Sequence, residues 1–207
     1  MDIIEGIKER RSINYFDRDR EVSDDKIKEL LELSRLTPSS LNLQPWEVLI
    51  VKSREKKKIL RECAMNQPKV EEASAVAVII ADPEACEKNI DKVTESWVKL
   101  GYMDRKTGDF YKTLPAKLYG EPDSPKRKLF AVKNAAFFAM SLMLSARGLG
   151  LETHPMDGFD ENCVKEKFGI AAGKVIPVII GLGYLSPTAR LLPRAYRKEV
   201  EEFSKIV

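Results

Sequence analysis

Histidine and cysteine are scarce in this chain of 207 residues, which has one histidine, His154, and three cysteines, Cys63, Cys86 and Cys163. A single histidine leaves little scope for a metal site or a Ser-His-Asp or Cys-His arrangement, unless His154 is itself the base. The cysteines are widely spaced and form no C-x-x-C pair, so neither a disulfide framework nor a zinc site is predicted. We expect buried or idle thiols in a reducing compartment, no metal, and no classical hydrolytic activity.

Glycine-rich phosphate motifs are also missing. The sequence contains no G-x-x-x-x-G-K-[ST] and no G-x-G-x-x-G, and its "GLG" at 148–150 follows a predicted helix where a strand would be required. A Rossmann dinucleotide site is therefore not predicted.

No charge of one sign dominates, because 35 basic and 32 acidic residues give a net charge of +3. The two signs are mixed along the chain, so neither a nucleic-acid-binding nor a membrane-binding face is predicted. The first residues, "MDIIEGIKERR", carry too short an apolar run for a signal or transmembrane segment. We expect a cytoplasmic protein.

The composition, 43% hydrophobic and 32% charged, is that of a globular protein. No linker-like stretch divides residues 1–207, which predicts a single domain. Apolar periodicity and capping residues predict helices near 3–9, 24–34, 54–63, 129–148 and 161–168, and strands at 46–52, 75–81 and 175–183. Helices between widely spaced strands favour an α+β (mixed α/β) fold with helices on both sides of one sheet.

Three regions depart from ordinary amphipathic patterns. Residues 129–148 are apolar on most sides, which predicts a buried central helix, in the core or against a partner subunit, with Gly148 at its C′ position. Residues 91–128 form a polar, weakly periodic insertion studded with aromatic side chains, which is typical of a lid or binding excursion. The tail beyond Pro187 is too apolar to stay free and is expected to dock, for example on another subunit.

Several polar groups each have a simple structural explanation. Arg10 and Arg11 could complement a helix dipole, and Asn66 and Lys69 could lie at an exposed helix end. The remaining groups would be turn and capping residues or surface charges, namely Ser39, Ser40, Asn42, Asp157, Gly158, Arg194 and Arg197. Their joint occurrence is the informative observation.

Five segments occur together in a recognisable order: "RRSINYF", "TPSSLNLQPW", "NQPKVEEAS", "GLGLETHPMDGF" and "GLGY". In this order they resemble the FMN-dependent nitroreductase family of NAD(P)H:acceptor flavin oxidoreductases. The resemblance covers most of the chain apart from 91–128 and the last residues. It implies a nitroreductase-like central sheet flanked by helices, and an intertwined homodimer with two FMN molecules at the subunit interface.

The resemblance also implies which residues hold the flavin. Arg10, Arg11 and Ser12 match positions near the phosphate and ring edge, and Arg194 and Arg197 match positions that complete the phosphate site, where an arginine fork suits phosphate oxygens. The "PSSLN" loop would reach the flavin of the other subunit through Pro38, Ser39, Ser40 and Asn42, with Gln44 joining them.

Asn66 and Lys69 match a pair at the pyrimidine end of the flavin ring, where a cation at Lys69 would stabilise the reduced, negatively charged form. The backbone of Pro155, Met156, Asp157 and Gly158 matches the segment that approaches flavin N5. Two residues depart from the family pattern. Asp157 replaces a frequent glutamate. Asn14 stands where many members have a lysine or arginine, which shifts more of the charge stabilisation onto Lys69.

The implied activity is transfer of hydride from NADH or NADPH, through flavin N5, to a nitroaromatic, quinone or related planar acceptor by a ping-pong mechanism. Aromatic residues of 91–128 would select the acceptor by stacking. The alternatives are a specialised relative, such as a dehalogenase, enone reductase or flavin-fragmenting enzyme, and a non-catalytic FMN-binding protein. A structural or nucleic-acid-binding role has only dispersed basic residues in its favour.

Overall fold

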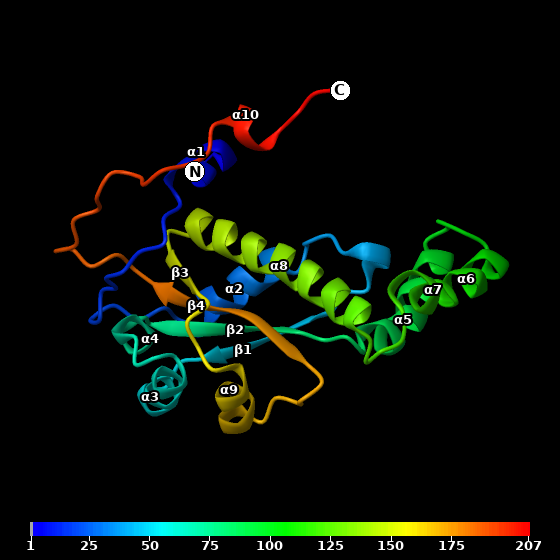
Figure 1. Cartoon of the computed structure of the whole chain (residues 1–207), viewed down its shortest axis with the longest axis horizontal. Coiled ribbons are helices and arrows are strands. Elements are labelled where there is room, and N and C mark those ends of the chain that lie inside the picture. The colour runs from blue at the N-terminus through cyan, green and yellow to red at the C-terminus, as the bar shows by residue number, and fades with distance from the viewer. Residues whose placement is uncertain (1) are drawn as a thin grey trace.

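The computed structural model describes residues 2–207 and is built around a four-stranded antiparallel sheet in the order β1-β2-β4-β3 (Figure 1). The strands are β1 (Trp46–Val51), β2 (Ala75–Ala81), β3 (Glu152–Met156) and β4 (Val175–Gly183). All seven residues of β2 are buried, because helices cover both faces of the sheet. Ala75, Ala77 and Ile79 join one hydrophobic cluster, and the alternate residues Val76, Val78 and Ile80 join a second one.

Two layers of helices provide these clusters. On one face lie α2 (Asp24–Ser34) and α8 (Pro125–Gly148), and on the other lie α3 (Arg54–Cys63), α4 (Pro68–Glu72) and α9 (Glu161–Phe168) (Figure 1). The hydroxyls of Ser23 and Ser53 cap α2 and α3 as predicted. The short helices α1 (Ile3–Glu9) and α10 (Val200–Phe203) lie near the two ends of the chain.

Strand β3 was not predicted. Its sequence, ETHPM, lacks the apolar run that indicated the other strands, and only Thr153 and Met156 are buried. It lies at the edge of the sheet, where β4 is its one neighbouring strand within residues 2–207 and Ser12 adds an isolated bridge to Thr153. Pro155 is tolerated in such an edge position.

Helix α8 is longer than predicted, and in the single chain it is buried along one side. It begins at Pro125, where the Ser124 hydroxyl accepts from the Arg127 backbone N–H. Gly148 is its last helical residue, so the prediction of Gly148 as the C′ residue is wrong; Gly150, with φ of 73°, adopts the left-handed conformation instead. One side of α8 packs on the sheet, whereas Leu129, Phe137 and Met140 are exposed.

Helix α8 is also long and apolar enough to cross a membrane by length and composition, with 44% of the relevant window buried in the protein. Its buried side contributes Phe130, Phe138 and Leu142 to the core, which is the behaviour of a core helix.

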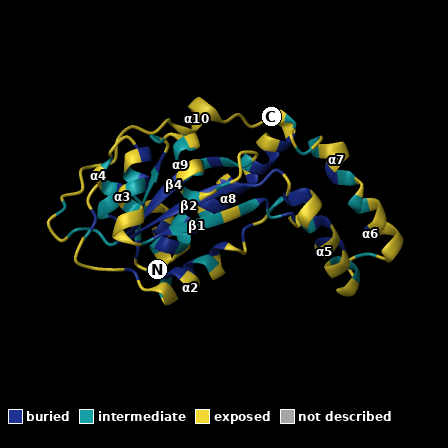
Figure 2. Cartoon of the chain, turned by 90° about the horizontal axis from the view of Figure 1, so that it is seen from below, coloured by how far each residue is buried: buried dark blue, intermediate teal, exposed yellow. Residues whose placement is uncertain are grey.

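Residues 91–128, for which periodicity predicted no element, are largely helical. They fall in α5 (Ala85–Lys99), α6 (Arg105–Lys112), α7 (Leu114–Tyr119) and the start of α8. The first three helices extend away from the sheet, and α6 is exposed along most of its length, which explains its weak apolar signal (Figures 1 and 2).

The prediction that all three cysteines are free thiols is wrong. Cys63, the last residue of α3, forms a disulfide with Cys163 of α9, and only Cys86 stays free and buried among residues 2–207. Helices α3 and α9 pack side by side on one face of the sheet, which brings the two cysteines together. Their separation of 100 residues left no local signal in the sequence.

Candidate functional site

Arginine side chains gather where the C-terminal tail passes the end of α1. Arg194 donates to the backbone carbonyl of Arg10 at 3.1 Å and to that of Lys8. Burial, followed by the neighbouring charges of Arg194 and Arg197, lowers the pKa of Arg10, and Glu152 opposes this effect. Within residues 2–207, Nη1 of Arg10 is buried without a hydrogen-bond partner. The cluster therefore has unused donor capacity that suits an anion with several acceptor oxygens.

Lys69 lies on α4 and points at the segment that follows Arg10. Its Nζ atom is 3.1 Å from Oδ1 of Asn14 and 3.1 Å from Nε2 of His154. Arg10 and Asn14 are separated by at most about 14 Å of chain. The site thus offers an arginine cluster at one end and a fixed ammonium group at the other, as an elongated ligand with a terminal anion requires.

His154 is a site residue that the sequence analysis did not select. It lies in β3, half-buried, and its Nδ1 atom is 2.6 Å from the backbone carbonyl oxygen of Ile13. Burial, followed by the charge of Lys69, lowers its pKa, whereas the contact with Ile13 raises it. Its position as the only histidine, directly before the "PMDG" segment, was the available signal.

The loop before Lys69 packs against the predicted N5 segment. Gln67 donates from Nε2 to the carbonyl of Gly158 at 2.8 Å. A Cβ atom at Gly158 would lie 3.1 Å from that same nitrogen, so a larger residue there would require the Gln67 side chain to shift. Met65 and Asn66 adopt left-handed φ angles of 51° and 55°. Gln67 is a second positioning residue that the sequence analysis missed.

The other residues of the predicted N5 segment follow the same strand. Pro155 and Met156 end β3, with Met156 buried, and Asp157 is exposed immediately after it. Asn66 is exposed on the neighbouring loop, where its backbone carbonyl accepts from Nε of Arg61 at 3.2 Å.

The "PSSLN" loop lies elsewhere in the same chain. The backbone N–H of Ser40 donates to Oδ1 of Asn134 at 3.0 Å, in the middle of α8. Arg147, which pairs with Glu9 of α1 at 2.6 Å, lies about 20 Å further along that helix at roughly 1.5 Å per residue. The structure therefore does not bring Pro38, Ser39, Ser40 and Asn42 to the arginine and Lys69 ends of the site within one chain.

Arg11 and Arg197 each donate a hydrogen bond to a backbone carbonyl group. Arg11 donates from Nη2 to the carbonyl of Leu192 at 2.8 Å, which ties the tail to the N-terminal segment. Arg197 donates to the carbonyl of Tyr196 at 2.8 Å while its charge still acts on Arg10. Ser12 is exposed and forms an isolated parallel bridge with Thr153 of β3.

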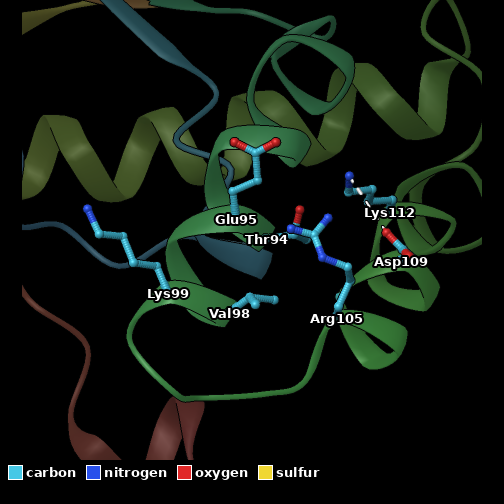
Figure 3. Close-up of a pocket in the computed structure, with 8 residues that line it drawn as sticks. Thr94, Glu95, Val98, Lys99, Arg105, Asp109 and Lys112 are labelled. Atoms are coloured by element: carbon cyan, nitrogen blue, oxygen red, sulfur yellow. Dashed lines mark ion pairs between the residues drawn. The ribbon is translucent and has the colours of Figure 1, made fainter.

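A separate cavity of about 190 Å³ opens between α5 and α6 (Figure 3). Its charged lining residues are Glu95, Lys99, Arg105, Asp109 and Lys112. The site described above shares none of them.

Comparison with known proteins identifies the family of the chain. A model of the Nitroreductase family matches residues 7–184. A Bacillus subtilis protein assigned as an NAD(P)H nitroreductase, YdgI, is 32% identical over 181 residues, which is 86% of each chain. The crystal structure of a B. subtilis protein assigned as the nitroreductase YdfN is 30% identical, has a TM-score of 0.92, and covers 99% of this chain and 98% of its own.

A further solved structure, from Exiguobacterium sibiricum, is of a protein assigned as a nitroreductase in complex with FMN. It is 28% identical with a TM-score of 0.84, covering 99% of this chain and 97% of its own. The family model and the similarity in sequence and structure together show that the chain belongs to the nitroreductase family and is an oxidoreductase of that type. The predicted family, enzyme class and helix-flanked sheet are confirmed; the homodimer and the individual site residues stay predictions.

Proposed function

We propose that this chain is an FMN-dependent oxidoreductase that takes hydride from NADH or NADPH and reduces a nitroaromatic, quinone or related planar acceptor by a ping-pong mechanism. The observation that carries the proposal is the buried Nη1 atom of Arg10, which has no hydrogen-bond partner among residues 2–207 and lies inside a group of three arginines. A phosphate would satisfy that atom and balance the charge. The FMN bound by the Exiguobacterium relative carries such a phosphate.

When bound, FMN would supply N5 as the atom that takes up and returns hydride, so no nucleophile is required of the protein. Arg10, Arg194 and Arg197 would hold the phosphate. Lys69 would place positive charge at the pyrimidine end of the ring, and the Pro155–Gly158 backbone would line the N5 region. Asn14 accepts a hydrogen bond from Lys69 and so helps to hold that cation in place.

A second copy of the chain is part of the proposal, because the residues assigned to the flavin occupy two separate places in one chain. Apolar side chains are exposed along α1, α8 and the tail, and exposed apolar surface of this kind is typical of an interaction site. They include Ile3, Ile4, Ile7, Leu129, Phe137, Met140, Leu191, Leu192, Val200 and Phe203. Pairing of two copies would cover these faces and bring the "PSSLN" loop of one to the arginines of the other.

Acceptor choice would fall to the extension formed by α5, α6 and α7. Phe110 is exposed on α6, next to an edge-to-face pair of Trp97 and Tyr111 whose ring centroids are 5.8 Å apart. The face of an exposed aromatic ring can stack on a flat molecule. The cytoplasmic location stays a prediction.

An absorbance spectrum of the purified protein, recorded before and after anaerobic addition of NADH and then of NADPH, tests cofactor and donor together. We expect flavin absorbance that the donor bleaches, and donor oxidation that depends on added quinone or nitroaromatic. A yellow protein that neither donor bleaches would favour a non-catalytic FMN-binding protein. A colourless protein that cannot take up added FMN would overturn the proposal.

A further inference from the structure

The ring of His154 joins three segments of the site. Its Nδ1 atom contacts the carbonyl of Ile13, its Nε2 atom contacts Nζ of Lys69, and its own strand continues into the Pro155–Gly158 segment. Ile13 is fully buried, and its backbone N–H donates to the carbonyl of Thr153 at 3.1 Å. The ring is therefore fixed between β3, the N-terminal segment and α4.

These contacts allow only one proton arrangement. A carbonyl oxygen only accepts, so at a separation of 2.6 Å the hydrogen must be on Nδ1 of His154. The ammonium group of Lys69 only donates, so Nε2 of the same ring must carry a free lone pair. The ring is then neutral, in the Nδ1–H tautomer. A proton on Nε2 would set two donors against each other at 3.1 Å.

The same contacts determine where the ammonium group of Lys69 points. It has three N–H bonds, of which one is directed at His154 and one at Asn14. Two fixed acceptors leave the third N–H with a defined direction. Burial and the charge of Lys69 both lower the pKa of His154, which keeps its lone pair available near neutral pH.

We infer that His154 is a positioning residue that, as a neutral Nδ1–H tautomer, accepts a hydrogen bond from Lys69 and orients its remaining N–H toward the pyrimidine end of the flavin. The effect on the flavin rests on the proposed function, because it requires bound FMN. The contact between His154 and Lys69 requires no ligand. The two parts can therefore be tested separately.

The contact is tested first in the full chain stripped of flavin. Because His154 is the only histidine, the imidazole nitrogen NMR signals belong to a single ring. We expect the Nδ1–H tautomer at neutral pH, and a higher pKa of His154 in Lys69→Met. The exposed Lys58 provides the matched control, and Lys58→Met should leave that pKa unchanged. An Nε2–H tautomer, or a pKa of His154 that is equal in Lys69→Met and Lys58→Met, would overturn the inference.

The consequence is tested by the midpoint potential of bound FMN in a double-mutant cycle. We expect His154→Leu to weaken the preference for reduced over oxidised flavin about tenfold, a fall of about 30 mV for a two-electron couple. The same change in a Lys69→Met background should have no further effect. His154→Gln, which keeps an acceptor for Lys69, should restore most of the potential.

Additive effects of His154→Leu and Lys69→Met on the potential would show a merely structural role and overturn the inference. Failure of the proposed function has a different signature. The wild-type chain would then bind no FMN, while the NMR experiment would still report on the contact between His154 and Lys69.

Discussion

The disulfide between Cys63 and Cys163 joins the end of α3 to α9, and each cysteine lies within a few residues of a loop of the site. Cys63 precedes the turn at Met65 and Asn66. Cys163 follows the Pro155–Gly158 segment, and the carbonyl of Cys63 also accepts from the N–H of Asp160 at 2.8 Å. The link holds together two parts of the chain that both approach Lys69.

Reduction of this disulfide is expected to destabilise the protein. A closed loop of 100 residues corresponds to about 4.7 kcal/mol in the chain-entropy model, a value that native-state effects often reduce. Denaturant unfolding with and without a phosphine reductant measures the loss. Thiol titration of the unfolded chain should give one thiol before reduction and three after it. Equal stability in both conditions, or three thiols without reductant, would show that the disulfide does not form.

A double variant, Cys63→Ser with Cys163→Ser, is the control for that experiment. Its stability should be the same with and without the reductant, because its remaining thiol is already reduced. The Cys86 thiol is buried and its pKa is raised to about 11, so it should not react in the folded protein.

Arg10→Ala is expected to weaken FMN binding by about tenfold or more, because a hydrogen bond to a charged group contributes roughly 1.5–3 kcal/mol. Riboflavin has the same ring without the phosphate, and its affinity should change little. Fluorescence titration measures both ligands. Arg11→Ala is the matched control, since Arg11 donates to tail carbonyls, and it should cost less FMN affinity than Arg10→Ala. Equal losses for FMN and riboflavin would remove Arg10 from the phosphate site.

The stability of the protein should depend on pH through His154. Its folded-state pKa lies below the ordinary value of 6.5, so the unfolded chain takes up a proton first as pH falls. The contribution of neutral His154 to the free energy of unfolding is therefore fully present above about pH 6.5 and is lost as pH falls below that value. Urea unfolding at a series of pH values for wild type and His154→Gln gives the difference. We expect the free energy of unfolding of wild type to fall relative to that of His154→Gln as pH is lowered. A rise of wild type relative to the variant would contradict the assigned pKa direction.

Phe137→Glu is expected to separate the proposed dimer, because Phe137 is 50% exposed in the single chain and lies on the apolar side of α8 that faces away from the sheet. Placing a carboxylate in an apolar interface without a partner is strongly unfavourable. Sedimentation velocity measures the result. Leu100→Glu, at an exposed position after α5, is the control and should leave the assembly intact. A monomeric wild-type protein would rule out the dimer.

Sequence patterns predicted the parts of the fold that repeat a local rule. The continuous apolar runs of β2 and β4 and the serine caps of α2 and α3 fall into this group. They did not predict β3, because an edge strand with one neighbour tolerates polar residues and proline. Helix α6 was not predicted for a related reason, because it buries little of its surface.

The site was predicted in a similarly uneven way. Motif resemblance selected Arg10 and Lys69, whose chemistry is visible in the residue type alone. His154 and Gln67 were missed, because their roles depend on contacts with Ile13, Lys69 and Gly158 that only the folded chain creates. The Cys63–Cys163 pair was missed for the same reason, as its partners are 100 residues apart.

In the part of the chain that the structure describes, left-handed backbone at non-glycine residues lies in two short loops. Among residues 2–207, the non-glycine positions with left-handed φ angles are Leu41, Asn42, Gln44, Met65 and Asn66. Each costs roughly 1 kcal/mol relative to glycine, and a whole domain is stable by only about 5–15 kcal/mol. Selection for thermal stability would therefore favour glycine at these positions, whereas selection for a well-ordered ligand site would oppose it. In these two loops, selection for thermal stability and selection for a rigid ligand site would favour different residues.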